Sequence, residues 1–251
     1  MNLAADQAVV DLNNSILDEL GYSIDKSSQI LEFGCGSGRH VYEYRDRGYI
    51  NAYGFDIKNY VELRNAEDEA WFRFSGENEE GRIPFPDDYF DIVHSTSVFE
   101  HVLKQDSAFK EINRVLKPGG IGLHNYPAKW RPIEPHTFVP FGGIIKSYWY
   151  YYFWAMTGIR NQYQKELSIS ETAIMNYTFG ESGIKYLGDK EMDRILSGIY
   201  SQYSYIEKNF LKYSKGRSRI LYMPSVIFPP LVKLFHSFHT RVLLTVKIRN
   251  T

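Results

Sequence analysis

The chain lacks several features that would place a protein directly in a broad class. Its 251 residues contain one cysteine, Cys35, so an internal disulfide is excluded and we expect a reducing, cytoplasmic compartment. Lysine and arginine number 29 against 30 aspartates and glutamates, a formal net charge of -1 that gives no overall signature of nucleic-acid binding. No apolar run is long enough to span a bilayer, and residues 1–7 lack a signal-peptide layout. We therefore expect neither a nucleic-acid partner nor an integral membrane segment.

Apolar segments alternate with helical periodicity along the first half of the chain. The strand-like runs are short, whereas the segments between them repeat apolar residues every three or four positions. This alternation favours βαβ units and a mainly parallel sheet, hence an α/β fold. We predict helices at 9–20, 39–47 and 106–116, the last capped by Asp106, and strands at 29–33, 53–57, 71–74, 90–97 and from 121.

The alternation stops after Pro127. Residues 128–188 contain the aromatic block 148–154, and we interpret this segment as an inserted lid within a single domain spanning 1–251. Ordinary core packing is the commonest explanation for such a block, while a ligand or a second subunit remains an open alternative. The alternation then resumes with a helix capped by Asp189, a strand over 203–211 and a final strand over 242–246.

Three glycines at alternate positions, Gly34, Gly36 and Gly38, follow the first predicted strand. Glycine permits unusual backbone angles and close approach of a ligand. A dinucleotide site would need glycine where Arg39 stands, and a phosphate-binding loop would need a Gly-Lys-Ser/Thr sequence that this stretch lacks. The pattern instead suits a cofactor whose carboxylate meets helix-terminal N–H groups and whose ribose meets an acid. Asp56, at the end of the second strand, has the position expected for that acid.

Several segments, taken in order, resemble the class I S-adenosylmethionine-dependent methyltransferases of the broad small-molecule, type 11-like group. The resemblance covers about the first half of the chain. It implies a Rossmann-like, doubly wound, seven-stranded sheet, mostly parallel, whose last strand is antiparallel and forms a hairpin with the strand before it. It also implies methyl transfer from S-adenosyl-L-methionine, with S-adenosyl-L-homocysteine as product. The matching segments are 30–38, 54–56, 83–93, 99–102 and 111–120.

The same resemblance implies which residues bind the cofactor. The glycine loop would line the methionine and ribose, Asp56 would accept the ribose hydroxyls, and Ile57 would pack on adenine. The residue for the adenine amino group falls where this chain has two extra residues, so we choose Glu77 and keep Asn78 and Glu79 as alternatives. The expected cofactor contacts are Glu32, Gly34, Cys35, Gly36, Ser37, Gly38, Asp56, Ile57, Glu77, Ser95, Thr96 and His101.

The acceptor site is expected after the fourth and fifth strands and in the insertion. Residues 130–141 are similar to a Pro-Ile-Glu-x-His-x-x-x-Pro-Phe segment of bacterial methyltransferases associated with polysaccharide assembly. Glu134 and His136 are two positions apart, so an extended backbone would point both side chains the same way. One interpretation makes the pair an oriented general base or a ligand of sugar hydroxyls, and the other makes it a structural tether of the lid. The expected acceptor contacts are Tyr126, Trp130 and Tyr148.

The predicted function is transfer of a methyl group to oxygen on a small-molecule or glycan-type acceptor. The alternative is a methyltransferase-like protein that binds the cofactor without turnover, and a homo-oligomer is compatible with either. The seven histidines are dispersed along the sequence, and His236 and His239 lack a cysteine or carboxylate at ligand spacing. We therefore expect no metal.

Overall fold

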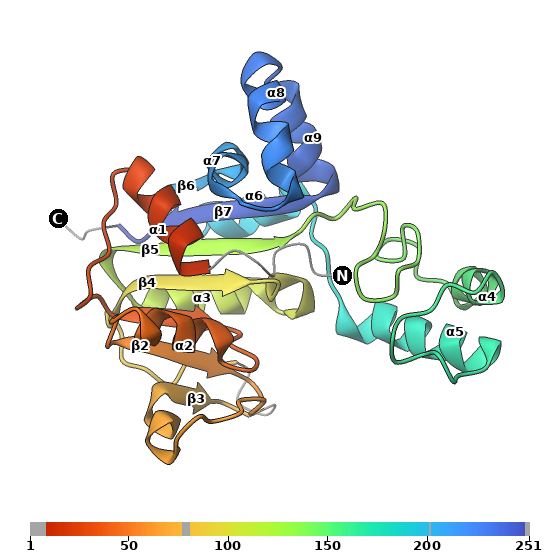
Figure 1. Cartoon of the computed structure of the whole chain (residues 1–251), viewed down its shortest axis with the longest axis horizontal. Coiled ribbons are helices and arrows are strands. Elements are labelled where there is room, and N and C mark those ends of the chain that lie inside the picture. The colour runs from red at the N-terminus through yellow and green to blue at the C-terminus, as the bar shows by residue number, and fades with distance from the viewer. Residues whose placement is uncertain (1–8, 77–80, 201, 249–251) are drawn as a thin grey trace.

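The computed structural model describes residues 9–76, 81–200 and 202–248, whose strands form one seven-stranded sheet (Figure 1). The strand order is β3-β2-β1-β4-β5-β7-β6, and β7 is antiparallel to both of its neighbours. The predicted Rossmann-like sheet, mostly parallel with an antiparallel last strand, is confirmed. The strands are β1 (Ile30–Phe33), β2 (Ala52–Asp56), β3 (Phe72–Phe74), β4 (Phe90–Thr96), β5 (Leu116–Pro127), β6 (Gln202–Tyr205) and β7 (Thr240–Val246).

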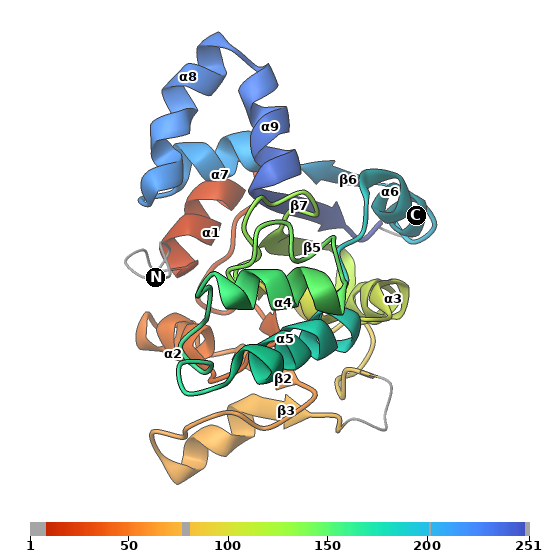
Figure 2. The same cartoon turned by 90° about the vertical axis from the view of Figure 1, so that its right-hand side faces the viewer.

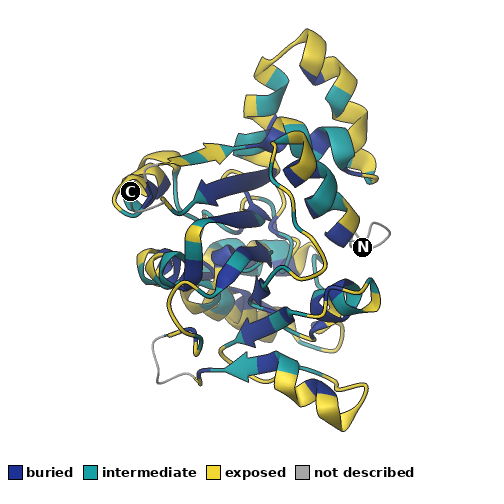
Figure 3. Ribbon diagram, turned by 90° about the vertical axis from the view of Figure 1, so that its left-hand side faces the viewer, coloured by how far each residue is buried: buried dark blue, intermediate teal, exposed yellow. Residues whose placement is uncertain are grey.

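Helices cover both faces of the sheet, and the alternation of side chains along each strand decides what each face contacts. Ile30 and Ile92 belong to the core shared with α1, α2 and α7, whereas Leu31 and Val93 belong to the core shared with α3 and α6. The central strands are accordingly buried on both sides (Figure 3). These helices are α1 (Val9–Glu19), α2 (Arg39–Asp46), α3 (Gln105–Val115), α6 (Asp189–Ser197) and α7 (Glu207–Tyr213).

The predicted strand over 203–211 is wrong in its second half. The strand ends at Tyr205, and α7 follows, because Ile206 and Phe210 are four residues apart and pack together into one face of the core. The last two strands pair antiparallel as expected, although α7, α8 (Tyr222–Ile227) and α9 (Pro230–Phe238) lie between them along the chain where a hairpin would have a turn.

Two predicted helix caps are shifted towards the N-terminus, by two residues in α3 and by one residue in α6. α3 begins at Gln105 after Lys104, and α6 begins at Asp189 after Gly188. Asp106 and Asp189 therefore lie in the first turns, where a negative charge still favours the helix through its dipole.

The segment 128–188 lies beyond the carboxyl ends of the parallel strands, in front of the sheet in Figure 2. Its two α-helices pack against each other, and Tyr151 is buried with its hydroxyl donating to the Gly142 carbonyl oxygen at 2.5 Å. Trp149, by contrast, is 73% exposed. One side of the aromatic block thus packs as core and the other faces outward. The elements of this segment are α4 (Tyr148–Met156), α5 (Ile169–Thr178) and the π-helix η3 (Phe179–Gly183).

The last two helices form a projection beside the sheet (Figure 1). α9 packs next to β7, and its Phe235 is buried with its ring 6.1 Å from that of Phe210 between centroids. Among all the helices of the described ranges, none has the length and apolar character needed to cross a bilayer. The remaining elements are α8 (Tyr222–Ile227), α9 (Pro230–Phe238) and the short 3-10 helices η1 (Ala66–Trp71), η2 (Phe99–His101) and η4 (Arg217–Leu221).

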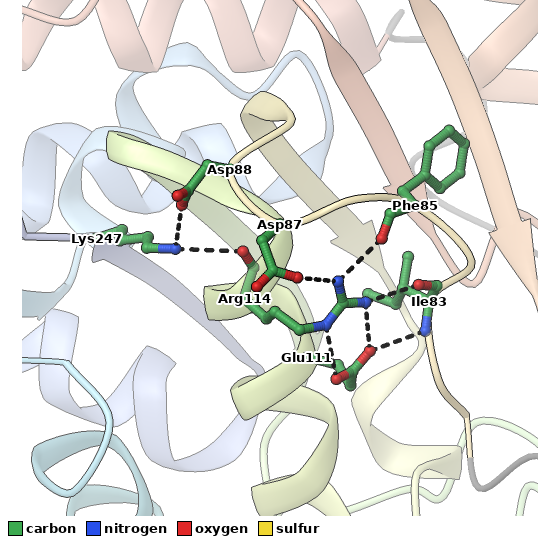
Figure 4. Close-up of polar contacts among 7 residues, drawn as sticks. All are labelled: Ile83, Phe85, Asp87, Asp88, Glu111, Arg114 and Lys247. Carbon is green, nitrogen blue, oxygen red and sulfur yellow. Dashed lines mark hydrogen bonds and ion pairs between the residues drawn. The ribbon is translucent and has the colours of Figure 1, made fainter.

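An ion-pair clamp fixes the segment that leads into β4 (Figure 4). The Arg114 guanidinium donates to the carbonyl oxygens of Ile83 and Phe85 at 2.7 and 2.9 Å. It also binds both carboxylate oxygens of Glu111, at 2.9 and 2.7 Å. Glu111 in turn accepts the Ile83 N–H at 3.0 Å. Two residues one helical turn apart on α3 therefore satisfy the backbone of a loop that has no partner strand.

We predict that Glu111→Gln destabilises the fold at pH 7 by about 1 kcal/mol, because a partly exposed charge-assisted contact is replaced by a weaker one. Hydrogen bonds from Arg114 hold the pKa of Glu111 below its ordinary value. The contribution is therefore full above the unfolded pKa and is lost as the pH falls through the lower folded pKa. Urea unfolding at pH 7 and pH 3 measures this. An equal difference between wild type and variant at both pH values would contradict the prediction.

Candidate functional site

The loop between β1 and α2 contains three glycines with positive φ, at 74° for Gly34, 50° for Gly36 and 77° for Gly38. A Cβ on Gly34 would lie 2.5 Å from the Val98 methyl carbons, and one on Gly38 would lie 2.7 Å from the Phe72 ring. At Gly36 a Cβ would meet nothing within 4 Å. The loop therefore packs closely at its two ends and presents bare backbone to open space in its middle.

Two acidic residues frame this loop. Asp56, half-buried at the end of β2, accepts the Gly36 N–H at 2.9 Å and the Ile57 N–H at 2.7 Å. Glu32 is buried, and its Oε1 accepts a hydrogen bond from His40 Nδ1 at 2.5 Å. Its Oε2 has no hydrogen-bond partner in the described structure. Burial raises the pKa of Glu32 despite the opposing contact with His40. An acid with one oxygen left free beside a bare backbone turn fits a polar ligand.

The other predicted cofactor residues occupy different environments. Cys35 is buried with its side chain against Gly54, and burial raises the pKa of its thiol, so it fills a small slot and is poorly suited as a nucleophile. Ser37 and Ile57 are exposed on the loops after β1 and β2. Glu77, with Asn78 and Glu79, lies outside the described residues.

The two cofactor contacts predicted at the end of β4, Ser95 and Thr96, differ in their burial. Ser95 is buried and bonds through Oγ to His124 Nδ1 at 2.9 Å, which places its hydroxyl inside the sheet. Thr96 is half-buried at the last position of the strand. His124 is fully buried, and burial lowers its pKa to about 3, so it is a neutral core residue.

Glu134 and His136 form a hydrogen-bonded pair. His136 Nδ1 donates to Glu134 Oε1 at 2.7 Å, and Tyr186 donates its hydroxyl proton to the same oxygen at 3.2 Å. Glu134 Oε2 accepts the backbone N–H groups of His136 and Thr137 at 2.8 and 2.6 Å. Burial opposes the charge, but these donors lower the pKa of Glu134, and Glu134 raises the pKa of His136. The two side chains therefore meet, as predicted. The backbone between them is not an extended strand but a loop, closed by a hydrogen bond from the Phe138 N–H to the Glu134 carbonyl oxygen.

The structure brings Glu100 and His101 of η2 to the same place as His136. One potential ligand atom from each of the three lies within 4.8 Å of the others. The His101 and His136 rings are 4.8 Å apart between centroids. Burial raises the pKa of Glu100 to about 7. Two of the seven histidines that are dispersed in the sequence are thus brought together here with a carboxylate.

Sequence reasoning gave no role to Glu100. The one local signal was its position beside His101 just after a strand end, where a carboxylate next to an imidazole is a candidate site. No local signal predicts the hydrogen bond between His101 Nδ1 and the Gly183 carbonyl oxygen, which are 2.8 Å apart. Gly183 is remote from His101 in the sequence.

This cluster lies next to the glycine loop. Val98, whose methyl groups fill the space beside Gly34, immediately precedes η2. The Phe33 and Phe99 rings stack at 5.9 Å between centroids. The loop that suits a cofactor and the cluster that suits proton or metal chemistry therefore share the carboxyl edge of β1 and β4.

The three predicted acceptor contacts have different surroundings. Tyr126 is buried at the end of β5, its ring 5.8 Å from that of Phe99. Trp130 is about half exposed, at 49%, just beyond that strand. Tyr148 is half-buried at the start of α4 and packs on the Trp149 ring at 5.2 Å. Of the three, only Tyr126 has a described ring contact with Phe99, the residue that precedes Glu100.

Comparison with known proteins gives matches to methyltransferases over part of the chain. A methyltransferase domain model matches residues 31–123. A ubiquinone/menaquinone biosynthesis C-methyltransferase of Cupriavidus metallidurans is 41% identical over 54 residues, which are 21% of this chain and 22% of the relative. A sterol 24-C-methyltransferase of Aspergillus fumigatus is 28% identical over 120 residues, 46% of this chain and 31% of the relative. The chain thus spans less than a third of the length of these curated relatives.

Solved structures show the same fold at low identity. A phosphoethanolamine N-methyltransferase of Haemonchus contortus, in complex with phosphomonomethylethanolamine and S-adenosylhomocysteine, aligns with a TM-score of 0.52 and 13% identity over 95% of this chain and 53% of that one. A geranyl diphosphate methyltransferase in complex with its methyl donor gives 0.51 and 14% over 98% and 88%. Residues 31–123 therefore match a methyltransferase domain model, and the solved structures share the fold of this chain.

Proposed function

We propose that this protein transfers a methyl group from S-adenosyl-L-methionine to a hydroxyl of a small-molecule or glycan-type acceptor. The observation that carries the proposal is the glycine loop, with its open middle at Gly36 and the Asp56 carboxylate bonded to it. The same loop lies within the matched methyltransferase domain. The single, buried cysteine supports a reducing, cytoplasmic compartment.

The residues around the loop fit the donor. S-adenosyl-L-methionine supplies an electrophilic methyl group on a positively charged sulfur. Backbone N–H groups at the start of α2 suit its carboxylate, and Asp56 suits its ribose hydroxyls. Glu32 has a buried oxygen without a hydrogen-bond donor among the described groups, which a polar group of the ligand would satisfy.

The Glu134–His136 pair supports oxygen as the methylated atom. His136 Nδ1 donates to Glu134, so its Nε2 is the nitrogen that can accept a proton. An acceptor hydroxyl would give its proton to Nε2 while its oxygen bonds to the methyl carbon, and the carbon–sulfur electron pair would return to sulfur. The curated relatives methylate carbon according to their names, so the choice of oxygen rests on this pair.

The segment 128–188 is proposed to cover the acceptor. It carries His136 and lies over the carboxyl edge of the strands, where closure would exclude water from the transfer (Figure 2). Its exposed aromatic side chains, such as Trp149, suit stacking against a sugar or aromatic ring.

We predict that Asp56→Ala weakens binding of S-adenosyl-L-homocysteine by about tenfold to a hundredfold, the effect of losing hydrogen bonds to a charged group. Isothermal titration calorimetry measures the affinity. Asp46→Ala is the matched control, because Asp46 lies at the opposite end of α2 from the glycine loop and pairs only with exposed Arg64 among its described contacts. Lack of binding by the wild type at millimolar ligand would refute the proposed cofactor.

We predict that His136→Ala slows methyl transfer by about a hundredfold or more while leaving S-adenosyl-L-homocysteine affinity within about threefold, as expected for loss of a group that handles the acceptor's proton. Transfer of labelled methyl groups into a small-molecule extract and a panel of sugars measures turnover. Unchanged turnover would make the Glu134–His136 pair structural. Cofactor binding with no labelled product from the wild type would favour a non-catalytic, cofactor-binding protein.

A further inference from the structure

Glu100 and His101 follow β4, whereas His136 comes from the segment after β5, yet their side chains converge within 4.8 Å. We infer that these three residues bind one divalent transition-metal ion. Two imidazoles and one carboxylate are a donor set that suits Zn²⁺, Fe²⁺ and Co²⁺. Binding of the ion is independent of the proposed methyl transfer, although its use in catalysis would rest on that function.

In both His101 and His136 the ring Nδ1 is hydrogen-bonded, which leaves Nε2 as the nitrogen that can bind a metal. His101 Nδ1 lies 2.8 Å from the Gly183 carbonyl oxygen, which can only accept, so Nδ1 carries the proton. His136 Nδ1 likewise donates to the Glu134 carboxylate at 2.7 Å. In each ring the Nε2 lone pair is therefore available. Metal-binding histidines characteristically donate their other N–H to a carboxylate or a backbone carbonyl, and these two rings show one case of each.

Glu100 provides independent support for a cation. Its side chain is 1% exposed, and neither carboxylate oxygen accepts a hydrogen bond from any described residue. A buried carboxylate without hydrogen-bond donors is unfavourable unless a cation compensates its charge. The Gln105 amide, which lies close by, donates instead to the carbonyl oxygens of Phe99 and Lys185. A metal ion would supply the missing partner.

The Phe179 ring packs against the cluster, whereas His101 is exposed to solvent. The Phe179 ring packs 5.2 Å from His136 and 6.2 Å from His101 between ring centroids. His101 itself is exposed, so the cluster can be reached from solvent. Metal–nitrogen distances of about 2.0 Å bring ligand atoms to within about 3.5 Å of one another, which small side-chain rotations would achieve here. Three protein ligands leave at least one coordination position for a water or an acceptor oxygen.

The ion would explain how an acceptor hydroxyl is activated next to the methyl donor. A hydroxyl bound to a divalent cation would lose its proton more readily, here to solvent; its oxygen could then bond to the methyl carbon while the carbon–sulfur bond breaks and its electron pair returns to sulfur. With its Nε2 on the ion, His136 would act as a ligand in place of the proposed role as proton acceptor, and Glu134 would position it through Nδ1. The loss of turnover expected for His136→Ala is common to both roles, so metal binding itself has to be measured.

The test is titration of the full chain, first treated with a chelator and dialysed, with Co²⁺ followed by visible absorption and with Zn²⁺ followed by calorimetry. We expect one ion per chain, with cobalt bands typical of mixed nitrogen and oxygen ligands. His101→Ala, exposed and therefore expected to fold, and Glu100→Gln should each weaken binding at least about tenfold. Glu134→Gln should weaken it about tenfold to a hundredfold through His136.

His236→Ala is the matched control. His236 also bonds to a carboxylate, Glu207 Oε1 at 2.7 Å, but lies outside the cluster, and its replacement should leave cobalt binding within about twofold. Absence of stoichiometric binding at millimolar Co²⁺ and Zn²⁺, or equal weakening by His236→Ala and His101→Ala, would overturn the proposal. A parallel titration with S-adenosyl-L-homocysteine separates the two hypotheses: cofactor binding without metal binding refutes the metal site alone, and metal binding without cofactor binding refutes the proposed donor alone.

Discussion

The parallel pairing of β1 with β2 on one side and β4 on the other is the constraint on which the site depends. The register places Phe33 opposite Phe55 and Glu32 opposite His94, so the loops after all three strands begin at the same level. Strand order also reverses between β1 and β4, and open α/β sheets bind their ligands at such a point. The pairing of the strands therefore brings the glycine loop, Asp56 and η2 to one edge of the sheet. No contact with a ligand is needed for this arrangement.

The parts of the site that could be predicted are those encoded by neighbouring residues. A buried strand, three glycines and a helix are consecutive in the chain, and Asp56 directly ends the next strand. Each of these signals is local, so the sequence pattern alone defines the loop and the acid beside it. The Glu134–His136 pair is local in the same sense, although a closed loop and not an extended strand brings the two side chains together.

Features that depend on contacts remote in sequence could not be predicted. His101 and His136 meet only because the segment after β5 folds back over the sheet edge, and no spacing in the sequence reports this. The mistaken strand over 203–211 has a related cause, since its alternating aromatic and polar residues fit a strand until Ile206 and Phe210 pack into the core as one helix face. Ser95 illustrates the same point on a smaller scale, because only the neighbouring strand turns its hydroxyl towards His124.

The hydrogen bond from His101 to the Gly183 carbonyl oxygen has a consequence for access to the site. Gly183 is the last residue of η3, which continues α5, so a segment late in the chain holds the ring of a residue at the end of β4. A displacement of α5 would break this bond and free the imidazole to rotate and to exchange its proton between its two nitrogens. Displacement of α5 and loss of the ordered histidine pair would therefore be a single conformational event.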